Sequence, residues 1–337
     1  MRRIWIQRGG ALLLTLVLTG GLAYILYCET LIRDERAPRP DARPEPAPSP
    51  GAKAPRARPG APPPPRPAEP APKTIRIGWT AWTDAELISQ MVERLLEAHT
   101  DYEVQLTMAD IGIQYQGVAD GSLDAMLMAW LPMTHHDYWE RLGAQVVNLG
   151  PMYLGARLGW AVPDYVPKSA VRTVGDLSDA RARRRFGGKI QGIDPGSGLM
   201  QVSERALEVY GLADWEIVAS SGAAMTAALE RAIRKNEWVV ITAWSPHWIF
   251  AQWDLRYLED PRGILGGRER VHALVRRGFY QDFDPRVTAF LARLYIPLAE
   301  LQQALLWATQ TSVAQAADRY IENHPARVHY WLTGELQ

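Results

Sequence analysis

The sequence predicts an α/β fold of two lobes, each with a mostly parallel sheet, that can close on each other like a clamshell. Segments typical of strands alternate with amphipathic helical segments from residue 73 onward, and this alternation indicates parallel sheets covered by helices. About 265 residues (337 − 72) follow that point, more than one hydrophobic core usually serves. Two apolar strands also stand where the chain would cross between lobes, which favours a hinge and a cleft.

The first lobe is expected over residues 73–158 together with 270–337. Apolar residues recur every three or four positions in its helical segments, as in helices with one buried face. Asp84 is the expected N-cap of the first helix. The expected strands are 74–79, 102–107 and 125–128, and the expected helices are 85–96, 111–119, 287–294, 298–308 and 313–322.

The second lobe is expected over residues 159–269 and repeats this plan. The chain is expected to enter it along a strand at 155–162 and to leave it along a strand at 271–278. In open α/β sheets, ligands bind at the carboxyl ends of the strands, so a site is expected there. The other expected elements are a helix start at 174–178, strands at 189–193, 215–219 and 239–242, and helices at 198–210 and 223–235.

Residues 1–36 are predicted to form a membrane anchor. The stretch 9–28 carries no charge and is long enough to cross a bilayer as a helix. Arg2, Arg3 and Arg8 precede it, which favours a cytoplasmic N-terminus and an exported remainder. A cleaved signal peptide is the alternative, although only the stretch 21–23 resembles a cleavage site. We expect an uncleaved transmembrane helix.

Residues 37–72 are predicted to be a linker, because they hold 15 of the 25 prolines of the chain. Such a segment is typical of an extended polyproline-type spacer, which rises about 3.1 Å per residue. A tail without a mechanical role is the alternative interpretation. Folding is therefore expected to begin near Lys73.

The composition narrows the class of partner. The 37 basic and 37 acidic residues balance, so no overall field attracts nucleic acid. The single cysteine, Cys28, cannot form a disulfide within the chain. Thirteen tryptophans against five phenylalanines is an unusual ratio, and it indicates that some indoles lie at a binding surface.

A short phrase, Ala-Trp-x-Pro, occurs twice, each time after an apolar strand segment. Its tryptophans are Trp130 and Trp244. Proline ends ladder pairing, so each phrase is expected to present an indole face at the mouth of one lobe. Either residue could instead be an ordinary core tryptophan.

Together with Trp82, these indoles could surround a quaternary ammonium group, which has no hydrogen to donate and is held by aromatic rings instead. Trp79 is the alternative third wall. The loop Gly192–Gly198 could offer backbone amides to an anion at a helix N-terminus, or it could be an ordinary turn; it lacks the nucleotide-binding patterns. His135 could donate to a ligand carboxylate, whereas a metal site and a nucleophilic triad are not indicated.

Six separated segments, which include these residues, resemble the glycine betaine/choline-type substrate-binding proteins of osmoprotectant ABC transporters. The resemblance extends from about Lys73 to the C-terminus. The segments are Trp79–Asp84, Asp124–His135, Gly192–Met200, Ala223–Leu229, Ala243–Trp248 and Asp254–Pro261. The resemblance implies a periplasmic-binding-protein fold. It also implies a tryptophan cage of Trp82, Trp130 and Trp244, and a ligand carboxylate held by His135 and by the amides of Gly192 and Ile193.

From this resemblance we expect an exported, membrane-tethered binding protein that delivers glycine betaine, or else proline betaine, carnitine or choline, to an ABC permease and its ATPase. The binding domain would lie in the periplasm or outside the cell. No cofactor, metal or enzymatic activity is expected. An enzyme acting on a quaternary amine and a sensory or scaffold module are the alternatives. The anchor and the long proline spacer depart from the family, whose members are commonly lipid-anchored, fused to the permease or free in the periplasm.

Overall fold

The computed structural model describes residues 73–336. The predicted anchor (1–36) and the predicted proline-rich linker (37–72) lie outside these residues. Within 73–336, no helix is both long and apolar enough to cross a membrane.

The strands form one mixed sheet in the order β2-β1-β3-β9-β4-β7-β5-β6, with β8 paired to β4. Pairing is parallel at both ends of this order, within β2-β1-β3 and within β7-β5-β6. It is antiparallel wherever β4 or β9 takes part. The parallel pairing expected from the sequence is thus found within each lobe, and the strands that connect the lobes make the whole sheet mixed. The bounds are β1 Lys73–Trp79, β2 Tyr102–Met108, β3 Ala125–Leu131, β4 Val146–Pro163, β5 Lys189–Gln191, β6 Glu216–Val218, β7 Val240–Ser245, β8 Leu255–Tyr257 and β9 Arg268–Arg276.

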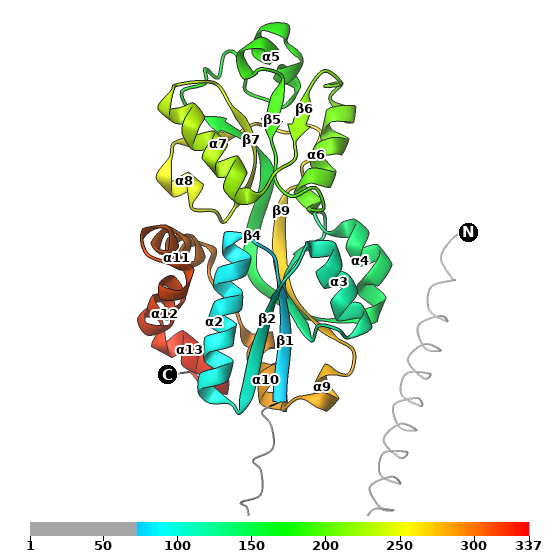
Figure 1. The fold of residues 1–337 in the computed structure, drawn as a ribbon, viewed down its shortest axis with the longest axis vertical. Helices are drawn as coiled ribbons and strands as arrows, with labels where there is room; N and C mark the ends of the chain where they lie inside the picture. The colour runs from blue at the N-terminus through cyan, green and yellow to red at the C-terminus, as the bar shows by residue number, and fades with distance from the viewer. Residues whose placement is uncertain (1–72, 337) are drawn as a thin grey trace, which may run out of the picture. The chain divides into compact units, whose positions relative to one another are not determined.

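Two strands connect the lobes, as the sequence predicts. In Figure 1, β4 and β9 run through the waist of the molecule, between a lobe built on β1–β3 and a lobe built on β5–β7. β4 pairs with β9 through residues 146–157 and with β7 through residues 157–161. The lobe limits expected from the sequence, 158/159 and 269/270, fall inside these two strands. They remain a proposal, because a strand shared by both lobes has no sharp boundary.

The strand β4 is longer than expected from the sequence, which predicts it only from residue 155. Gly150, Pro151 and Gly155 interrupt its apolar pattern, and such residues usually mark turns. The structure instead accommodates them as irregularities in the pairing with β9, near residues 148–150, 151–153 and 154–156. Pairing along a partner strand therefore overrides the local preference.

Helices cover both faces of the sheet, and each long helix that the sequence predicts is present. The sequence patterns did not predict the short helices α4, α5, α8 and α9, the short strand β8, or the last helix, α13, which follows α12 with Pro325 as its first residue. The bounds are α2 Thr83–His99, α3 Ile111–Asp120, α4 His136–Leu142, α5 Ala180–Phe186, α6 Gly198–Val209, α7 Gly222–Arg234, α8 Ile249–Gln252, α9 Phe279–Asp282, α10 Pro285–Arg293, α11 Leu298–Gln310, α12 Val313–Asn323 and α13 Pro325–Thr333. Short 3₁₀ turns lie at Gly143–Gln145 and Gly175–Ser178.

One helix start differs from its expectation. Helix α2 begins at Thr83, so Trp82 is its N-cap and Asp84 lies inside its first turn. The prediction of Asp84 as the N-cap is therefore wrong. Its carboxylate accepts hydrogen bonds from Tyr153 and Trp244 instead.

Candidate functional site

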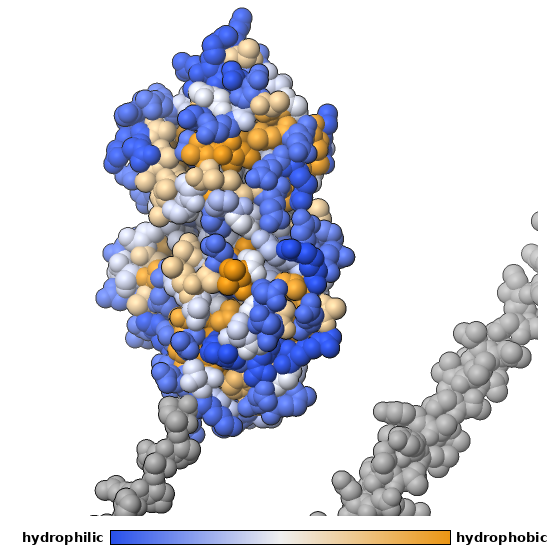
Figure 2. Space-filling view, turned by 45° about the vertical axis from the view of Figure 1, so that its right-hand side comes forward, coloured by the Kyte–Doolittle hydropathy of each residue, from blue (hydrophilic) through white to orange (hydrophobic). Residues whose placement is uncertain are grey.

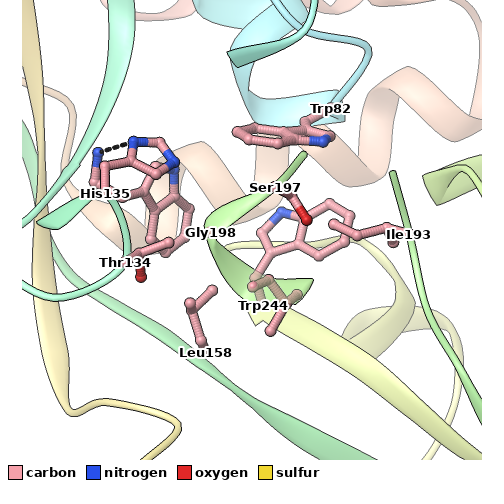
Figure 3. A pocket seen from close by; sticks show the side chains of 10 residues that line it. Trp82, Thr134, His135, Leu158, Ile193, Ser197, Gly198 and Trp244 are labelled. Atoms are coloured by element: carbon pink, nitrogen blue, oxygen red, sulfur yellow. Dashed lines mark hydrogen bonds between the residues drawn. The ribbon is translucent and has the colours of Figure 1, made fainter. Parts of the chain in front are cut away.

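A cavity lies where the two lobes meet. From the first lobe it is lined by Trp82, Trp130, Thr134 and His135; from β4 by Leu158; and from the second lobe by Ile193, Ser197, Gly198, Leu199 and Trp244. Its empty volume is about 280 Å³, part of which is open to solvent. Figure 3 shows Trp82 at the top of the cavity, Trp244 below it and His135 to the left. The cavity thus joins four separate stretches of the chain with one crossing strand.

The three tryptophans of the expected cage all line this cavity. Trp82, Trp130 and Trp244 are 7%, 3% and 4% exposed, respectively. Trp82 stands between β1 and α2, while Trp130 and Trp244 lie at the ends of β3 and β7. Each of the latter two is followed by a cis X-Pro bond, at Pro132 and Pro246. Trp79 is only partly buried and does not line the cavity.

His135 is held in one chemical form. Its Nδ1 accepts the backbone N–H of Trp130 at 3.1 Å, and its Nε2 is buried without a hydrogen-bond partner among residues 73–336. Burial lowers the pKa of His135 to about 3, so the ring is neutral at physiological pH. Because Nδ1 is an acceptor, the ring proton must sit on Nε2. His135 therefore offers one N–H donor without an acceptor at the cavity.

A carboxylate absent from the sequence-based site fixes the loop that carries His135. Glu269, on β9, is 1% exposed. It accepts the amides of Met133 at 3.1 Å and Thr134 at 3.0 Å, and also the Thr134 hydroxyl. No local pattern in the sequence could have indicated Glu269, because 135 residues separate it from Thr134.

The loop between β5 and α6 contributes one of the two expected residues, Ile193, to the lining of the cavity, but not Gly192. The Gly192 amide donates to the carbonyl oxygen of Val218 at 3.0 Å, and Gly192 does not line the cavity. Ile193 does line it. Gly198 and Leu199 also line it and are the first two residues of α6. Their N–H groups have no intrahelical acceptor, and a helix N-terminus favours an anion.

The lobes approach each other closely around the cavity. A Cβ atom on Gly198 would overlap the carbonyl oxygen of Thr134 and would lie 2.6 Å from its methyl group. The Tyr138 hydroxyl donates to the Gly196 carbonyl oxygen at 2.8 Å. On another side, the Gln302 side chain makes two hydrogen bonds to the backbone of His247. Atoms of both lobes meet at the waist in the space-filling view (Figure 2). The structure is thus a closed one.

The arrangement suits a compact ligand that has a methylated cation at one end and an anion at the other. The cavity brings together three indole side chains, the ring of His135 and the first residues of α6. Within residues 73–336, no group of three or more His, Cys, Asp or Glu side chains could hold a metal ion.

Two α/β lobes, two crossing strands and a cavity between them define the class of solute-binding proteins that close around their ligand. Residues 73–323 match the family described as the substrate binding domain of ABC-type glycine betaine transport system, and the chain belongs to this family. It is a family of transport proteins rather than enzymes.

Individual relatives agree with this family. The chain is 34% identical over 148 residues to the glycine betaine/carnitine transport binding protein GbuC of Listeria monocytogenes, a match that covers 43% of this chain and 49% of that protein. The chain thus spans about half the length of this curated relative. The fold is similar to lactococcal OpuAC in its closed conformation with glycine betaine (TM-score 0.72, 33% identity, covering 77% of this chain and 100% of that one). It is also similar to a choline binding protein in complex with choline (TM-score 0.71, 25% identity, 80% and 94% covered).

Proposed function

We propose that this protein binds glycine betaine, or a closely related quaternary ammonium compound, in the cavity between its lobes. It would release the ligand to an ABC permease driven by its ATPase. The observation that carries this proposal is the meeting of Trp82, Trp130 and Trp244 in one buried cavity. Two relatives with the same fold are described in complex with glycine betaine and with choline.

The tryptophans would hold the cationic end. A trimethylammonium group offers only weakly polar methyl groups to its surroundings, so ring faces stabilise it better than hydrogen-bond acceptors do. Each indole face contributes about 0.5–2 kcal/mol when the cation is desolvated. Three faces supply a large part of the roughly 8 kcal/mol that micromolar binding requires.

The carboxylate of the ligand would be bound by the hydrogen-bond donors of His135 and of the start of α6. The Nε2–H of His135 has no acceptor within residues 73–336, and the amides of Gly198 and Leu199 lie at the N-terminus of α6. We propose that these two amides take the role that the family resemblance assigns to Gly192 and Ile193. The Gly192 amide is already bonded to Val218, whereas Ile193 remains a candidate because it lines the cavity.

The attachment to the membrane is part of the same proposal. Residues 1–36 would anchor the chain, and residues 37–72 would place the binding domain at a distance from the bilayer on the outer side. Protease accessibility of intact cells and a shift in mass on cleavage would test the orientation and the retention of the anchor.

A competition experiment tests the ligand. Glycine betaine is titrated into the purified chain by isothermal titration calorimetry, followed by proline betaine, carnitine and choline. The zwitterions should bind, and choline should bind more weakly than glycine betaine because it has no carboxylate for His135 and the start of α6. Absence of heat and of any change in tryptophan fluorescence at millimolar glycine betaine would exclude this ligand. Choline binding equal to glycine betaine would exclude the proposed carboxylate site.

A further inference from the structure

Two hydrogen bonds cross from one lobe to the other at the cage itself. The indole N–H of Trp82, in the first lobe, donates to Oδ1 of Asp194 in the second lobe at 2.9 Å. The indole N–H of Trp244, in the second lobe, donates to Oδ1 of Asp84 in the first lobe at 3.2 Å. Each of these cage tryptophans is therefore bonded to a carboxylate of the opposite lobe.

Asp84 is well placed to hold Trp244. It is 1% exposed in the first turn of α2, and its other oxygen accepts the Tyr153 hydroxyl at 2.7 Å. This second bond lies within the first lobe and β4, so it orients the carboxylate whether or not the second lobe is near. Asp84 thus presents a fixed acceptor toward the indole that approaches from the other lobe.

For Trp82 the lobes exchange roles: the indole belongs to the first lobe, and the acceptor, Asp194, belongs to the second. It follows Ile193 in the loop between β5 and α6, and its Oδ2 has no partner within residues 73–336. The same loop carries Gly196, whose carbonyl oxygen accepts the Tyr138 hydroxyl of the first lobe. One loop of the second lobe therefore contacts the first lobe at two separate points.

Trp130 differs from the other two cage residues. Its indole N–H has no partner within residues 73–336, and its ring lies edge-on to Tyr153 at 6.4 Å between centroids. Its backbone is bonded to His135 of the same lobe. Trp130 is therefore positioned within its own lobe, whereas Trp82 and Trp244 each make a bond that exists only when the lobes are together.

We propose that Asp84 and Asp194 are positioning residues that act as a reciprocal latch, fixing Trp244 and Trp82 in the cage when the lobes close. This inference rests on the proposed function, because it assumes that the cage is the ligand site. The bonds gained on closure are ones that the open form lacks, so they bias the equilibrium toward the closed form. They also set the orientation of two of the three ring faces on which cation binding depends.

A simpler explanation of these two bonds is that buried indole N–H groups usually have a hydrogen-bond partner, whatever the lobes do. That explanation predicts an effect on folding stability and none on lobe closure. The latch predicts an effect on closure, and the two are separated by measuring the distance between the lobes.

The experiment uses single-molecule energy transfer in the full-length chain. Dyes are attached through Ala98→Cys in the first lobe and Ala180→Cys in the second, both at exposed positions, in a Cys28→Ser background. The closed fraction is measured without ligand and with saturating glycine betaine. The dissociation rate and Kd are measured in parallel, and urea unfolding reports folding stability.

Asp194→Ala removes the acceptor, and we expect the closed fraction to fall in both conditions, with the Kd and the dissociation rate rising at least tenfold. Asp194→Asn keeps an oxygen acceptor and should stay within threefold of the unmodified chain. In a Trp82→Phe background, where the N–H is gone, adding Asp194→Ala should change the Kd less than twofold. Trp244→Phe should reduce the closed fraction as Asp194→Ala does. Tyr153→Phe should reduce it less, because it removes only the bond that orients Asp84 and leaves the bond between Asp84 and Trp244 in place.

Asp110→Asn is the matched control. Asp110 is an exposed carboxylate close enough to Asp194 to act on it through its charge, but it makes no cap hydrogen bond. An effect of Asp110→Asn equal to that of Asp194→Ala would show that net charge matters rather than the latch, and would overturn the proposal. So would an unchanged closed fraction in Asp194→Ala. Failure of the unmodified chain to bind glycine betaine would refute the ligand instead, and the closed fractions without ligand would still decide the latch.

Discussion

The two Ala-Trp-x-Pro segments have the same local structure but are held in different ways. Each ends a strand with a buried tryptophan and a cis proline bond. After Trp130, the loop is fixed by Glu269 of β9, and His135 lines the cavity with an Nε2 that has no partner among the described residues. After Trp244, the histidine at position 247 packs against the indole, and its backbone is bonded to Gln302 of the other lobe. The first segment is thus fixed by the crossing strand β9, whereas the second is bonded to a helix of the opposite lobe.

Glu269→Ala should give the largest effect, and it acts on the segment that follows Trp130. It leaves the amides of Met133 and Thr134 and the Thr134 hydroxyl without their acceptor. Each buried donor left without an acceptor costs about 1–3 kcal/mol, and the two donors of Thr134 are buried. We expect the free energy of unfolding to fall by about 3 kcal/mol or more in urea denaturation. Glu269→Gln keeps one oxygen acceptor, so it should lower the free energy of unfolding less than Glu269→Ala does. Equal losses for the two variants would contradict the role of Glu269 as acceptor.

Gly198→Ala acts on the contact between lobes. The added methyl would overlap the backbone of Thr134, so the closed arrangement could not form unchanged, while alanine is well tolerated in a helix. We expect glycine betaine affinity to drop about thirtyfold, or roughly 2 kcal/mol, with folding stability unaffected. Gly196→Ala is the control, because no atom of residues 73–336 lies within 4 Å of its added Cβ. Comparable affinity for the two variants would argue against closure around the ligand.

His135→Ala tests the donor that distinguishes the first segment from the second. A hydrogen bond to a charged group contributes about 1.5–3 kcal/mol, so the Kd for glycine betaine should rise at least tenfold while that for choline changes little. Calorimetry on both ligands measures the difference. The neighbouring exposed residue His136 provides the control in His136→Ala. A parallel loss of choline affinity would mean that His135 shapes the cage rather than binding a carboxylate.

Lowering the pH should reduce folding stability through the buried histidine of each segment. Burial lowers the pKa values of His135 and His247 from 6.5 to about 3. Between pH 6.5 and 3, these histidines are protonated in the unfolded chain but neutral in the folded chain. The free energy of unfolding therefore falls as the pH decreases from about 6.5 toward 3. Each histidine contributes at most about 1.4 kcal/mol per pH unit. Urea denaturation from pH 7.5 to 5 should show this slope, and His135→Gln should reduce it. A slope unchanged in His135→Gln would show that other groups dominate.

The smallest effect is expected at Trp79. This residue is partly buried and outside the cavity, so Trp79→Ala should change glycine betaine affinity less than threefold. Trp82→Ala, three residues away, should weaken binding far more because it removes a ring face. Fluorescence titration of both variants compares them directly. The reverse order would place the third wall of the cage at Trp79.

Most elements and much of the candidate site could be predicted because they depend on local patterns. The helices α2, α6, α7 and α11 follow from apolar residues at helical spacing, and Trp130 and Trp244 follow from strand ends marked by proline. The strand β4 was only partly predicted, because its glycines and proline imitate turns. The amides that hold the carboxylate were assigned to Gly192 and Ile193 by resemblance, while the loop up to Gly198 was predicted to offer amides to an anion at a helix N-terminus.

The sequence by itself determined the alternation of strands and helices, the family, and the three indoles that now line one cavity. Each of these depends on neighbouring residues or on short motifs. Tertiary structure alone decided which polar groups serve those indoles. Glu269 reaches Thr134 across 135 residues, Asp194 reaches Trp82 across 112, and Asp84 reaches Trp244 across 160. The pairing of β5 with β6 likewise places the Gly192 amide against Val218, whereas the first residues of α6 line the cavity. These hydrogen bonds join residues that are close in space but far apart in the sequence, so no local pattern of residues predicts them.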